Sequence, residues 1–416
     1  MSSILPRARD GLVVYVAGTA WSGNRFPDQH MTERLSAHVP VLYVDPPLSY
    51  LTTRRHPHLA EALERPRLRL INDNLARVTP VVLPGKGRPG IKPLTSALTR
   101  RAIRRAVQAL DASVSAIVVA NLEPHFSLFP GAHRVLYGTD DLVAGAQLMN
   151  VPAARLRRYE RTLLREADTV VSCSPALAAK WERMGAEVTL VPNGVDAALF
   201  AQTARATPAT DVTLPRPIVG FVGHLSDRID IECLRAVADR GCSLLLVGPR
   251  QATFDPAAVE GLFSRPNVQW VGARPFEELP SYLTLMDVGV VPYTASAFNL
   301  GSFPLKILEY LAAGRPCVST DLPSIQWLRA NAQATFPPGP GGRGNLVDIA
   351  TDPQDFADVV LRRLEEAHDP ELVARRQAFA QSHSWDSRAA QFAELLRERT
   401  SLGASAPVTA DEDALD

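Results

Sequence analysis

The sequence predicts an α/β protein built from two doubly wound, Rossmann-like domains. The chain has 416 residues, which is too long for one ordinary hydrophobic core and suits two domains of about 200 residues each. Short apolar runs rich in β-branched residues alternate with amphipathic helical patterns along both halves of the chain. Residues 197–216 are rich in Ala, Thr and Pro and interrupt this alternation, so we expect them to form a linker.

The apolar runs of the first half are expected to be buried parallel strands. They are residues 13–17, 41–44, 117–120, 135–137 and 169–173, with helical patterns between them at 95–110 and 153–166. The same alternation of strand and helix patterns returns between residues 219 and 347. We therefore predict an N-terminal domain at 1–196 and a C-terminal domain at 217–383. A helix at 384–400 is expected to pack back on the N-terminal domain, and residues 401–416 are expected to be a disordered acidic tail.

Composition describes a globular protein without a membrane span. No uninterrupted apolar run approaches the roughly 20 residues that cross a bilayer. The four cysteines lack metal-binding spacing and lie in or near apolar segments, which fits small core residues in a reducing cytoplasm. Residues 1–195 hold 25 Lys and Arg against 16 Asp and Glu, and the second half has the opposite excess. This asymmetry is either ordinary solvated surface or a sign that the first half meets an anionic surface or substrate.

The stretch from Ser302 to Asp321 has the features of a nucleotide site. A Pro-initiated amphipathic helix is expected here, ended by Gly314 and followed by a buried strand. The unpaired N–H groups and the positive dipole at a helix start attract anions, and phosphate is the usual occupant. Lys306 adds a positive charge in the first turn, and Glu309 could accept hydrogen bonds from vicinal hydroxyls such as those of a ribose.

This segment resembles the donor-nucleotide motif of GT-B-fold glycosyltransferases, and more closely that of glycosyltransferase family 4. Its form, Asn…Ser-x-Pro-Leu-Lys-x-x-Glu-Tyr, is similar to a teichuronic-acid-type subgroup. Further similar segments read IVGFVGHL, LLLVGP, VQWVGARPFEELPSY, VGVVPY, VPNGVDAALF and HSWDSRAAQF. The resemblance spans roughly residues 12 to 395. It implies a GT-B fold, in which two Rossmann-like domains face each other across a cleft with the donor on the C-terminal domain.

The resemblance also implies which residues hold the donor nucleotide-sugar. Family members usually carry a first glutamate at the position of Gly301, so the contact with the donor sugar is altered in this chain. The arginine and lysine that usually follow the first glycine turn are absent too, and Arg228 is the expected substitute. The resulting donor set comprises Gly18, Gly223, Arg228, Gly272, Arg274, Asn299, Ser302, Lys306 and Glu309. Arg228 and Asn299 could equally be ordinary surface or loop residues.

Two residues of the first half are candidates for catalysis. His125 follows the strand pattern at 117–120 and could hydrogen-bond the sugar or an acceptor hydroxyl, although a structural His is an equal alternative. Asp141 follows the pattern at 135–137 and could orient or deprotonate an acceptor hydroxyl, or simply cap the next helix. The loop after the first strand lacks Gly-x-Gly-x-x-Gly spacing, so no nicotinamide cofactor is expected. The adjacent pair Asp140-Asp141 is not a spaced Asp-x-Asp motif, so no metal is expected either.

The sequence thus predicts a glycosyltransferase that moves a sugar from a UDP- or GDP-sugar to an acceptor hydroxyl. The resemblance implies retention of anomeric configuration and a role in cell-surface polysaccharide or glycolipid synthesis. One alternative is a non-hydrolysing sugar-nucleotide epimerase of similar architecture, and another is a non-catalytic nucleotide-sugar-binding protein. Binding of nucleic acid is not expected.

A basic helix suggests contact with the inner face of the membrane. Four arginines lie on the predicted helix 95–110: Arg100, Arg101, Arg104 and Arg105. Each Lys or Arg near an anionic bilayer contributes about 1 kcal/mol, so this helix could give weak peripheral attachment. The alternative is that the apolar side of the helix is core and its arginines are solvated.

Overall fold

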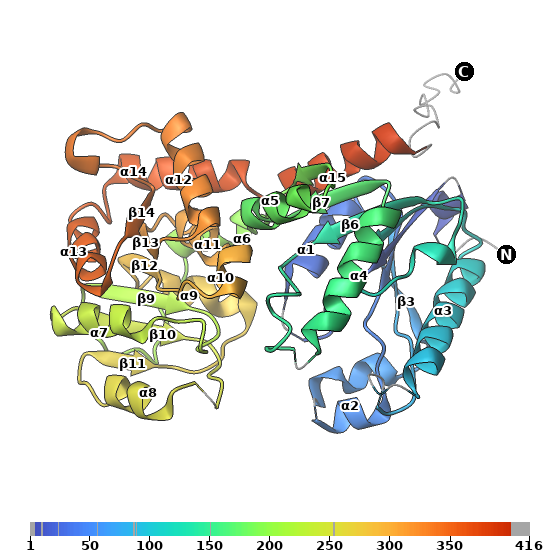
Figure 1. Ribbon diagram of the computed structural model, residues 1–416. Coiled ribbons are helices and arrows are strands. Elements are labelled where there is room, and N and C mark those ends of the chain that lie inside the picture. Colours follow the sequence, from blue (N-terminus) through green and yellow to red (C-terminus); the bar gives the residue numbers. More distant parts are fainter. Residues whose placement is uncertain are drawn as a thin grey trace, which may run out of the picture. The chain divides into compact units, whose positions relative to one another are not determined.

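The structure is a computed structural model that describes residues 5–9, 11–23, 25–55, 57–85, 88, 90–149, 151–252 and 254–400. The predicted tail at 401–416 lies outside the described residues. The fold is mixed α/β, with mostly parallel sheets flanked by helices (Figure 1). All four cysteines are buried. Among the helices that are described, none is both long enough and apolar enough to cross a membrane.

The chain divides into two compact units, with a boundary that differs from the predicted one at residue 196. The first unit comprises residues 1–137, 157–171 and 389–416, and the second comprises residues 138–156 and 172–388. Helix α5 (Pro175–Arg183) belongs to the second unit because it packs against α10 (Ala297–Gly301) and α12 (Pro323–Thr335). The backbone of Val195 pairs with Ser384, which ties the segment before residue 196 to the same unit.

The first sheet has eight strands in the order β3-β4-β2-β1-β5-β6-β7-β8. The strands are β1 (Leu12–Val16), β2 (Val41–Val44), β3 (Leu68–Asn72), β4 (Leu75–Val78), β5 (Val114–Val119), β6 (His133–Gly138), β7 (Thr169–Ser172) and β8 (Val188–Leu190). Strand β1 is buried along its whole length and pairs in parallel with β2 and β5. The five predicted strands are confirmed to within a few residues. The sequence did not predict β3, β4 or β8, and β3 pairs antiparallel with β4.

Helices flank this sheet in the first unit. They are η1 (Pro6–Arg9), α1 (Pro27–Leu35), α2 (Tyr50–Arg55), η2 (Pro57–Leu63), α3 (Lys92–Ala109), η3 (Phe126–Leu128) and α4 (Ala153–Glu166), together with most of α15 (Trp385–Arg399). The apolar side of α3 is buried through Ile103 and Val107, as its sequence pattern predicts. Its arginines differ from one another in exposure. Arg101, Arg104 and Arg105 are exposed, whereas Arg100 is half-buried and donates to the Ser127 hydroxyl.

The second sheet has six parallel strands in the order β11-β10-β9-β12-β13-β14. The strands are β9 (Ile218–Val222), β10 (Ser243–Val247), β11 (Val268–Trp270), β12 (Val288–Val291), β13 (Cys317–Thr320) and β14 (Val347–Ala350). The strand order runs outward in one direction from β9 and in the other from β12. In open parallel sheets this reversal is where ligands bind, beyond the carboxyl ends of the strands.

The remaining helices of the second unit connect and cover these strands (Figure 1). They are α6 (Ala197–Ala201), η4 (Gln202–Ala204), α7 (Ile231–Asp239), α8 (Pro256–Phe263), η5 (Phe276–Glu278), α9 (Leu279–Leu283), α11 (Leu305–Ala312), η6 (Pro340–Gly342), α13 (Pro353–Leu364) and α14 (Pro370–Ser382). The expected linker at 197–216 therefore begins with two short helices. Helix α11 ends at Ala312, and Gly314 follows with a φ of +76°, as the sequence pattern predicts.

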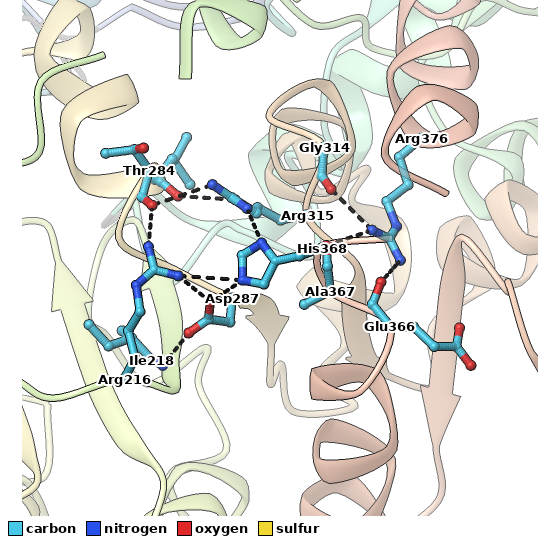
Figure 2. A network of polar contacts seen from close by, with 11 residues as sticks. Arg216, Ile218, Thr284, Asp287, Gly314, Arg315, Glu366, Ala367, His368 and Arg376 are labelled. Atoms are coloured by element: carbon cyan, nitrogen blue, oxygen red, sulfur yellow. Dashed lines mark hydrogen bonds and ion pairs between the residues drawn. The ribbon is translucent and has the colours of Figure 1, made fainter. Parts of the chain in front are cut away.

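A polar network joins the connection between α13 and α14 to the amino end of β9, as Figure 2 shows. The buried carboxylate of Asp287 accepts hydrogen bonds from the Ile218 backbone N–H and from His368 Nε2, each at 2.6 Å. Arg216 pairs with the same carboxylate. One carboxylate thus joins three segments that are distant in the sequence.

Arg376 of α14 is the second centre of this network (Figure 2). It is fully buried, and its guanidinium donates to the carbonyls of Gly314, Glu366 and Ala367 at 3.1 to 3.2 Å. Burial lowers the pKa of Arg376 to about 10. Three carbonyl acceptors compensate for removing this charge from water, which is the usual condition for a buried Arg.

Candidate functional site

Glycines follow three neighbouring strands of the second sheet at their carboxyl ends. Gly223 follows β9 with a φ of +146°, Gly248 follows β10 with a φ of +141°, and Gly272 comes shortly after β11. A β-carbon on Gly248 would lie 2.0 Å from the carbonyl oxygen of Gly223, so the two backbones touch. Gly248 N–H donates to the carbonyl of Gly272 at 2.8 Å. The three turns therefore form one continuous backbone surface beside the strand-order reversal.

Lys306 lies directly over the first of these turns. It is the second residue of α11, and its Cε is 2.0 Å from the position that a β-carbon on Gly223 would take. Its Nζ donates a hydrogen bond to the hydroxyl of Tyr293 at 2.8 Å. Tyr293 follows β12, the strand on the other side of the reversal. The first turn of α11 thus adds an ammonium group and helix N–H groups to the glycine surface, a combination that attracts anions.

Arg228 is a second cation that is held in place at this site. Its guanidinium carbon lies 4.7 Å from the ring centroid of Tyr293 and 4.8 Å from that of Phe298. Its Nε donates to Asn299 Oδ1 at 2.7 Å, and its terminal nitrogen donates to Ser302 Oγ at 3.3 Å. The structure thus brings together three of the predicted donor-site residues in one network. This gives Arg228 a defined position, unlike an ordinary surface arginine.

Asn299 is the residue that closes this network. Its side chain is fully buried, and its Nδ2 donates to the backbone carbonyls of Arg228 and Thr294, each at 2.9 Å. It therefore binds both the side chain and the backbone of Arg228. The alternative that Asn299 is an ordinary loop residue does not fit these contacts.

The carboxylate of Glu309 is partly buried and accepts no hydrogen bond from the described residues. It lies one turn after Lys306 on α11 and is half-buried. Burial raises the pKa of Glu309 to about 7, and the charge of Lys306 opposes this rise. No residue in the described part of the chain donates a hydrogen bond to its side chain. A partly buried acceptor without a partner is costly in the free protein, so a donor supplied by a bound molecule would satisfy it.

The electrostatics of the site favour an anion with hydroxyl groups nearby. Besides Lys306 and Arg228, His224 follows Gly223, and its pKa is lowered by partial burial of the ring and by these two cations. The pKa of Tyr293 is also lowered, because the charges of Lys306 and Arg228 outweigh the opposite effect of burial. Phosphate oxygens suit the cations and the helix start, and vicinal hydroxyls suit Glu309.

Asp141 lies beside the same loop and is not an isolated carboxylate. Its Oδ1 accepts hydrogen bonds from the backbone N–H groups of Val143 and Ala144, as in the capping arrangement that the sequence allowed. It also pairs with Lys180, with Nζ 3.0 Å from Oδ1. A β-carbon on Gly301 would be only 2.7 Å from the Asp141 Cβ. Asp141 therefore occupies the space next to Gly301, where family members usually carry a glutamate.

Arg274 is occupied by partners within its own unit. Its guanidinium pairs with Asp211 and donates to the Tyr282 hydroxyl, and the side-chain hydrogen bond from Arg274 lowers the pKa of Asp211. These contacts tie the segment before β9 to the turn after β11. Gly272 has a φ of +78°, and the nearest atom to its β-carbon position is a guanidinium nitrogen of Arg274 at 3.9 Å. The structure therefore places Gly272 at the glycine surface and gives Arg274 a structural partner.

The two predicted residues of the first unit have other surroundings. Gly18 N–H donates to Asp28 Oδ2 at 2.9 Å, and the same oxygen accepts from the backbone and hydroxyl of Thr19. The loop after β1 is thus organised by a buried carboxylate of the chain itself. His125 is 4% exposed, and burial lowers its pKa to about 4, so the ring is neutral at pH 7. This placement agrees with the alternative that His125 is structural.

Sequence reasoning did not assign a role to Tyr293. The residue was visible only as the end of the segment VGVVPY. A polar aromatic residue directly after a buried strand at the strand-order reversal is a signal that could have identified it. Groups of His, Cys, Asp and Glu that could hold a metal ion are absent from the described part of the chain.

Comparison with known proteins identifies a family match that covers the second sheet. Residues 216–366 match the family model described as glycosyl transferases group 1. The second unit carries a group 1 glycosyltransferase domain. This domain contains Gly223, Arg228, Lys306 and Glu309 and the whole of β9 to β14.

One curated relative resembles part of the chain. TuaH of Bacillus subtilis strain 168, assigned to teichuronic acid biosynthesis as a glycosyltransferase, is 33% identical over 177 residues. The alignment covers 41% of this chain and 44% of TuaH, so the chain spans less than half the length of this relative.

Solved structures with a similar fold cover nearly all of this chain. Sucrose-phosphate synthase from Thermosynechococcus elongatus has a TM-score of 0.68 and 18% identity, covering 95% of this chain and all of that chain. Anabaena HepE in complex with UDP has a TM-score of 0.63 and 15% identity, covering 93% of this chain and all of that chain. Both are GT-B proteins, so the predicted GT-B fold around the group 1 domain is confirmed.

Proposed function

We propose that this protein is a glycosyltransferase that moves a sugar from a nucleoside-diphosphate donor to an acceptor hydroxyl. The observation that carries the proposal is the placement of Lys306 and Arg228 around Tyr293 at the strand-order reversal of a group 1 glycosyltransferase domain. Two cations and a helix start would hold the diphosphate and stabilise the charge that develops on it as the sugar leaves. Glu309 would accept hydrogen bonds from the ribose hydroxyls.

The donor and the biological setting follow from the relatives. HepE was solved with UDP, which supports a UDP-sugar as the first donor to test, with GDP-sugars as the second. TuaH is assigned to teichuronic acid biosynthesis, which supports a role in cell-surface polysaccharide synthesis. The resemblance to glycosyltransferase family 4 supports retention of configuration through front-side attack by the acceptor hydroxyl.

Asp141 remains the candidate for contact with the sugar or the acceptor. Its carboxylate lies against Gly301 in the loop that also presents Asn299 and Ser302. Its bonds to Lys180 and to two backbone N–H groups would hold it in one orientation. We assign it the role of positioning a hydroxyl. His125, which is buried and neutral, would contribute only from within the core of the first unit.

The acceptor is proposed to come from an anionic membrane surface. Arg101, Arg104 and Arg105 project from α3 as exposed side chains, while the opposite side of α3 is buried. Three exposed positive charges on one helix suit anionic lipid headgroups, each contributing about 1 kcal/mol near the surface. This would place a lipid-linked acceptor within reach of the enzyme.

The test is release of nucleoside diphosphate from a panel of UDP- and GDP-sugars, with and without a membrane or glycan extract. A glycosyltransferase releases UDP or GDP only when the extract supplies an acceptor. An epimerase converts the sugar nucleotide without any extract and without stoichiometric release, and a binding protein does neither. Either of these two outcomes would contradict the proposal.

A further inference from the structure

The ring of Tyr293 is shared by the two cations of the site. Its hydroxyl accepts the hydrogen bond from Lys306 Nζ at 2.8 Å. The guanidinium carbon of Arg228 lies 4.7 Å from the ring centroid, and Lys306 Nζ lies 5.5 Å from it. A cation over an aromatic face is attracted by the negative potential of the ring, more strongly when the pair is shielded from water. One side chain therefore contacts both charges.

The position of Tyr293 itself is fixed from two sides. Its carbonyl accepts a hydrogen bond from Thr320 Oγ1 at 2.6 Å, at the end of β13. Its backbone pairs with Ile229 in an antiparallel bridge, and Pro292 accepts from Asp230 N–H at 2.7 Å. The side chain is 3% exposed, so its rotamer is confined by packing. A rigid support of this kind can hold flexible side chains such as Lys306 in a binding geometry.

Lys306 and Arg228 carry like charges, which repel each other in the free protein. The charges of Lys306 and Arg228 both lie close to Tyr293 and lower the pKa of its hydroxyl against the opposite effect of burial. Without the tyrosine hydroxyl, the long side chain of Lys306 would lose its one side-chain hydrogen bond in the described structure. It would then sample several rotamers and would have to be ordered again on binding, which reduces affinity.

We propose that Tyr293 is a positioning residue of the nucleotide-phosphate site, holding Lys306 through its hydroxyl and Arg228 through its ring face. The inference rests on the proposed function, because it assumes that the diphosphate of a nucleotide binds at these two cations. It adds that the hydroxyl acts on the phosphate-dependent part of the affinity and acts through Lys306.

The test uses the full chain and compares UDP with uridine, or GDP with guanosine if GDP is the tighter ligand. Tyr293→Phe removes the hydroxyl and keeps the ring. We expect UDP affinity to fall about tenfold, as for loss of one hydrogen bond to a charged group, and uridine affinity to stay unchanged. In a Lys306→Met background, the same change should alter UDP affinity by less than about twofold, since coupled residues are not additive. Tyr293→Leu should weaken UDP binding further because Arg228 also loses its aromatic partner.

Tyr310→Phe is the matched control. Its hydroxyl is also buried and accepts from the Val222 backbone N–H at 2.9 Å, but it contacts neither cation. The change should shift the melting temperature and leave the ratio of UDP to uridine affinity unchanged. The inference is overturned if Tyr293→Phe binds UDP like the wild type or loses affinity for UDP and uridine alike. It is also overturned if Tyr293→Phe lowers UDP affinity in the Lys306→Met background as much as it does in the wild type. A wild-type chain that binds neither nucleoside diphosphate overturns the donor site and this inference together.

Discussion

The side chain of Lys306 fills the space that a β-carbon on Gly223 would need. The Cε of Lys306 is 2.0 Å from that position, and Gly223 has a φ of +146°, which side-chain-bearing residues rarely adopt. The glycine is therefore required both for the turn after β9 and for the approach of the cation. This relationship links the end of one strand to the start of α11, which is why the site can be tested from either residue.

Gly223→Ala is expected to weaken nucleotide binding by at least about tenfold. The new methyl group must displace Lys306 and strain the turn, which costs of order 1–3 kcal/mol. Gly241→Ala is the matched control, because Gly241 has a φ of +81° but nothing within 4 Å of its β-carbon position. It should lower stability without changing affinity. Equal nucleotide affinity in Gly223→Ala and the wild type would contradict the placement of the phosphate, as measured by titration calorimetry.

Nucleotide affinity should rise with pH in a way that depends on Glu309. Burial raises its pKa to about 7 in the free protein, so the neutral acid is populated at and below neutral pH. Ribose hydroxyls donate to the carboxylate and favour its charged form, so binding releases a proton. Affinity should therefore increase from about pH 6 to about pH 8. Glu309→Gln should retain only the smaller pH dependence of the nucleotide's own phosphate.

The same carboxylate should affect stability with the opposite sign. A raised pKa means that the folded state gains stability from the proton, and this gain is lost as pH rises from 4.5 to about 7. Glu309→Gln should therefore melt at a higher temperature than the wild type at pH 8 and at a similar temperature at pH 4. A variant that melts lower at pH 8 would indicate that Glu309 has a structural partner.

Arg376→Ala should destabilise the second unit strongly. The change leaves the carbonyls of Gly314, Glu366 and Ala367 without their donor in a buried place, for an expected loss of about 3–5 kcal/mol. Arg375→Ala is the neighbouring control, since Arg375 is only partly buried and pairs with the exposed Glu371, a contact worth about 0.5 kcal/mol. Urea unfolding of both variants provides the comparison. Similar losses would show that the buried network does not stabilise the unit.

The arginines of α3 give a prediction for membrane binding. Reversing Arg101, Arg104 and Arg105 to Glu should abolish sedimentation with anionic vesicles at low salt. The control reverses three exposed arginines of the second unit to Glu: Arg183, Arg205 and Arg343. It changes the net charge equally and should leave sedimentation largely intact. Failure of the wild type to bind either anionic or neutral vesicles would favour a soluble acceptor.

The sequence predicts the parallel strands well because their apolar runs are buried. Strand β2 has the predicted bounds, and β1, β5, β6 and β7 differ by a few residues. Strands β3, β4 and β8 were not predicted, because β3 and β8 are partly exposed and the short run of β4 is interrupted by Arg77. The two compact units divide the chain differently from the predicted boundary at residue 196, because α5 lies before that residue and packs against α10 and α12.

The candidate site was predictable where one segment carries it. Lys306 and Glu309 lie on the same short helix, so their spacing shows in the sequence. The role of Tyr293 depends on side chains from the turn after β9, the end of β12 and the start of α11 meeting at one point. The pairing of Arg274 with Asp211 likewise depends on residues 63 positions apart. Such contacts follow from the folded arrangement and leave no local pattern.

Titration calorimetry of UDP and GDP against the wild type, Lys306→Ala and Glu309→Ala tests the central claim most directly. The account predicts that the wild type binds at least one nucleotide in the presence of EDTA. Each variant should remain folded and lose about 10- to 150-fold in affinity, because each lacks charge-assisted hydrogen bonds worth about 1.5–3 kcal/mol. Unchanged affinity in both folded variants, or binding that requires Mg²⁺ or Mn²⁺, would contradict the account.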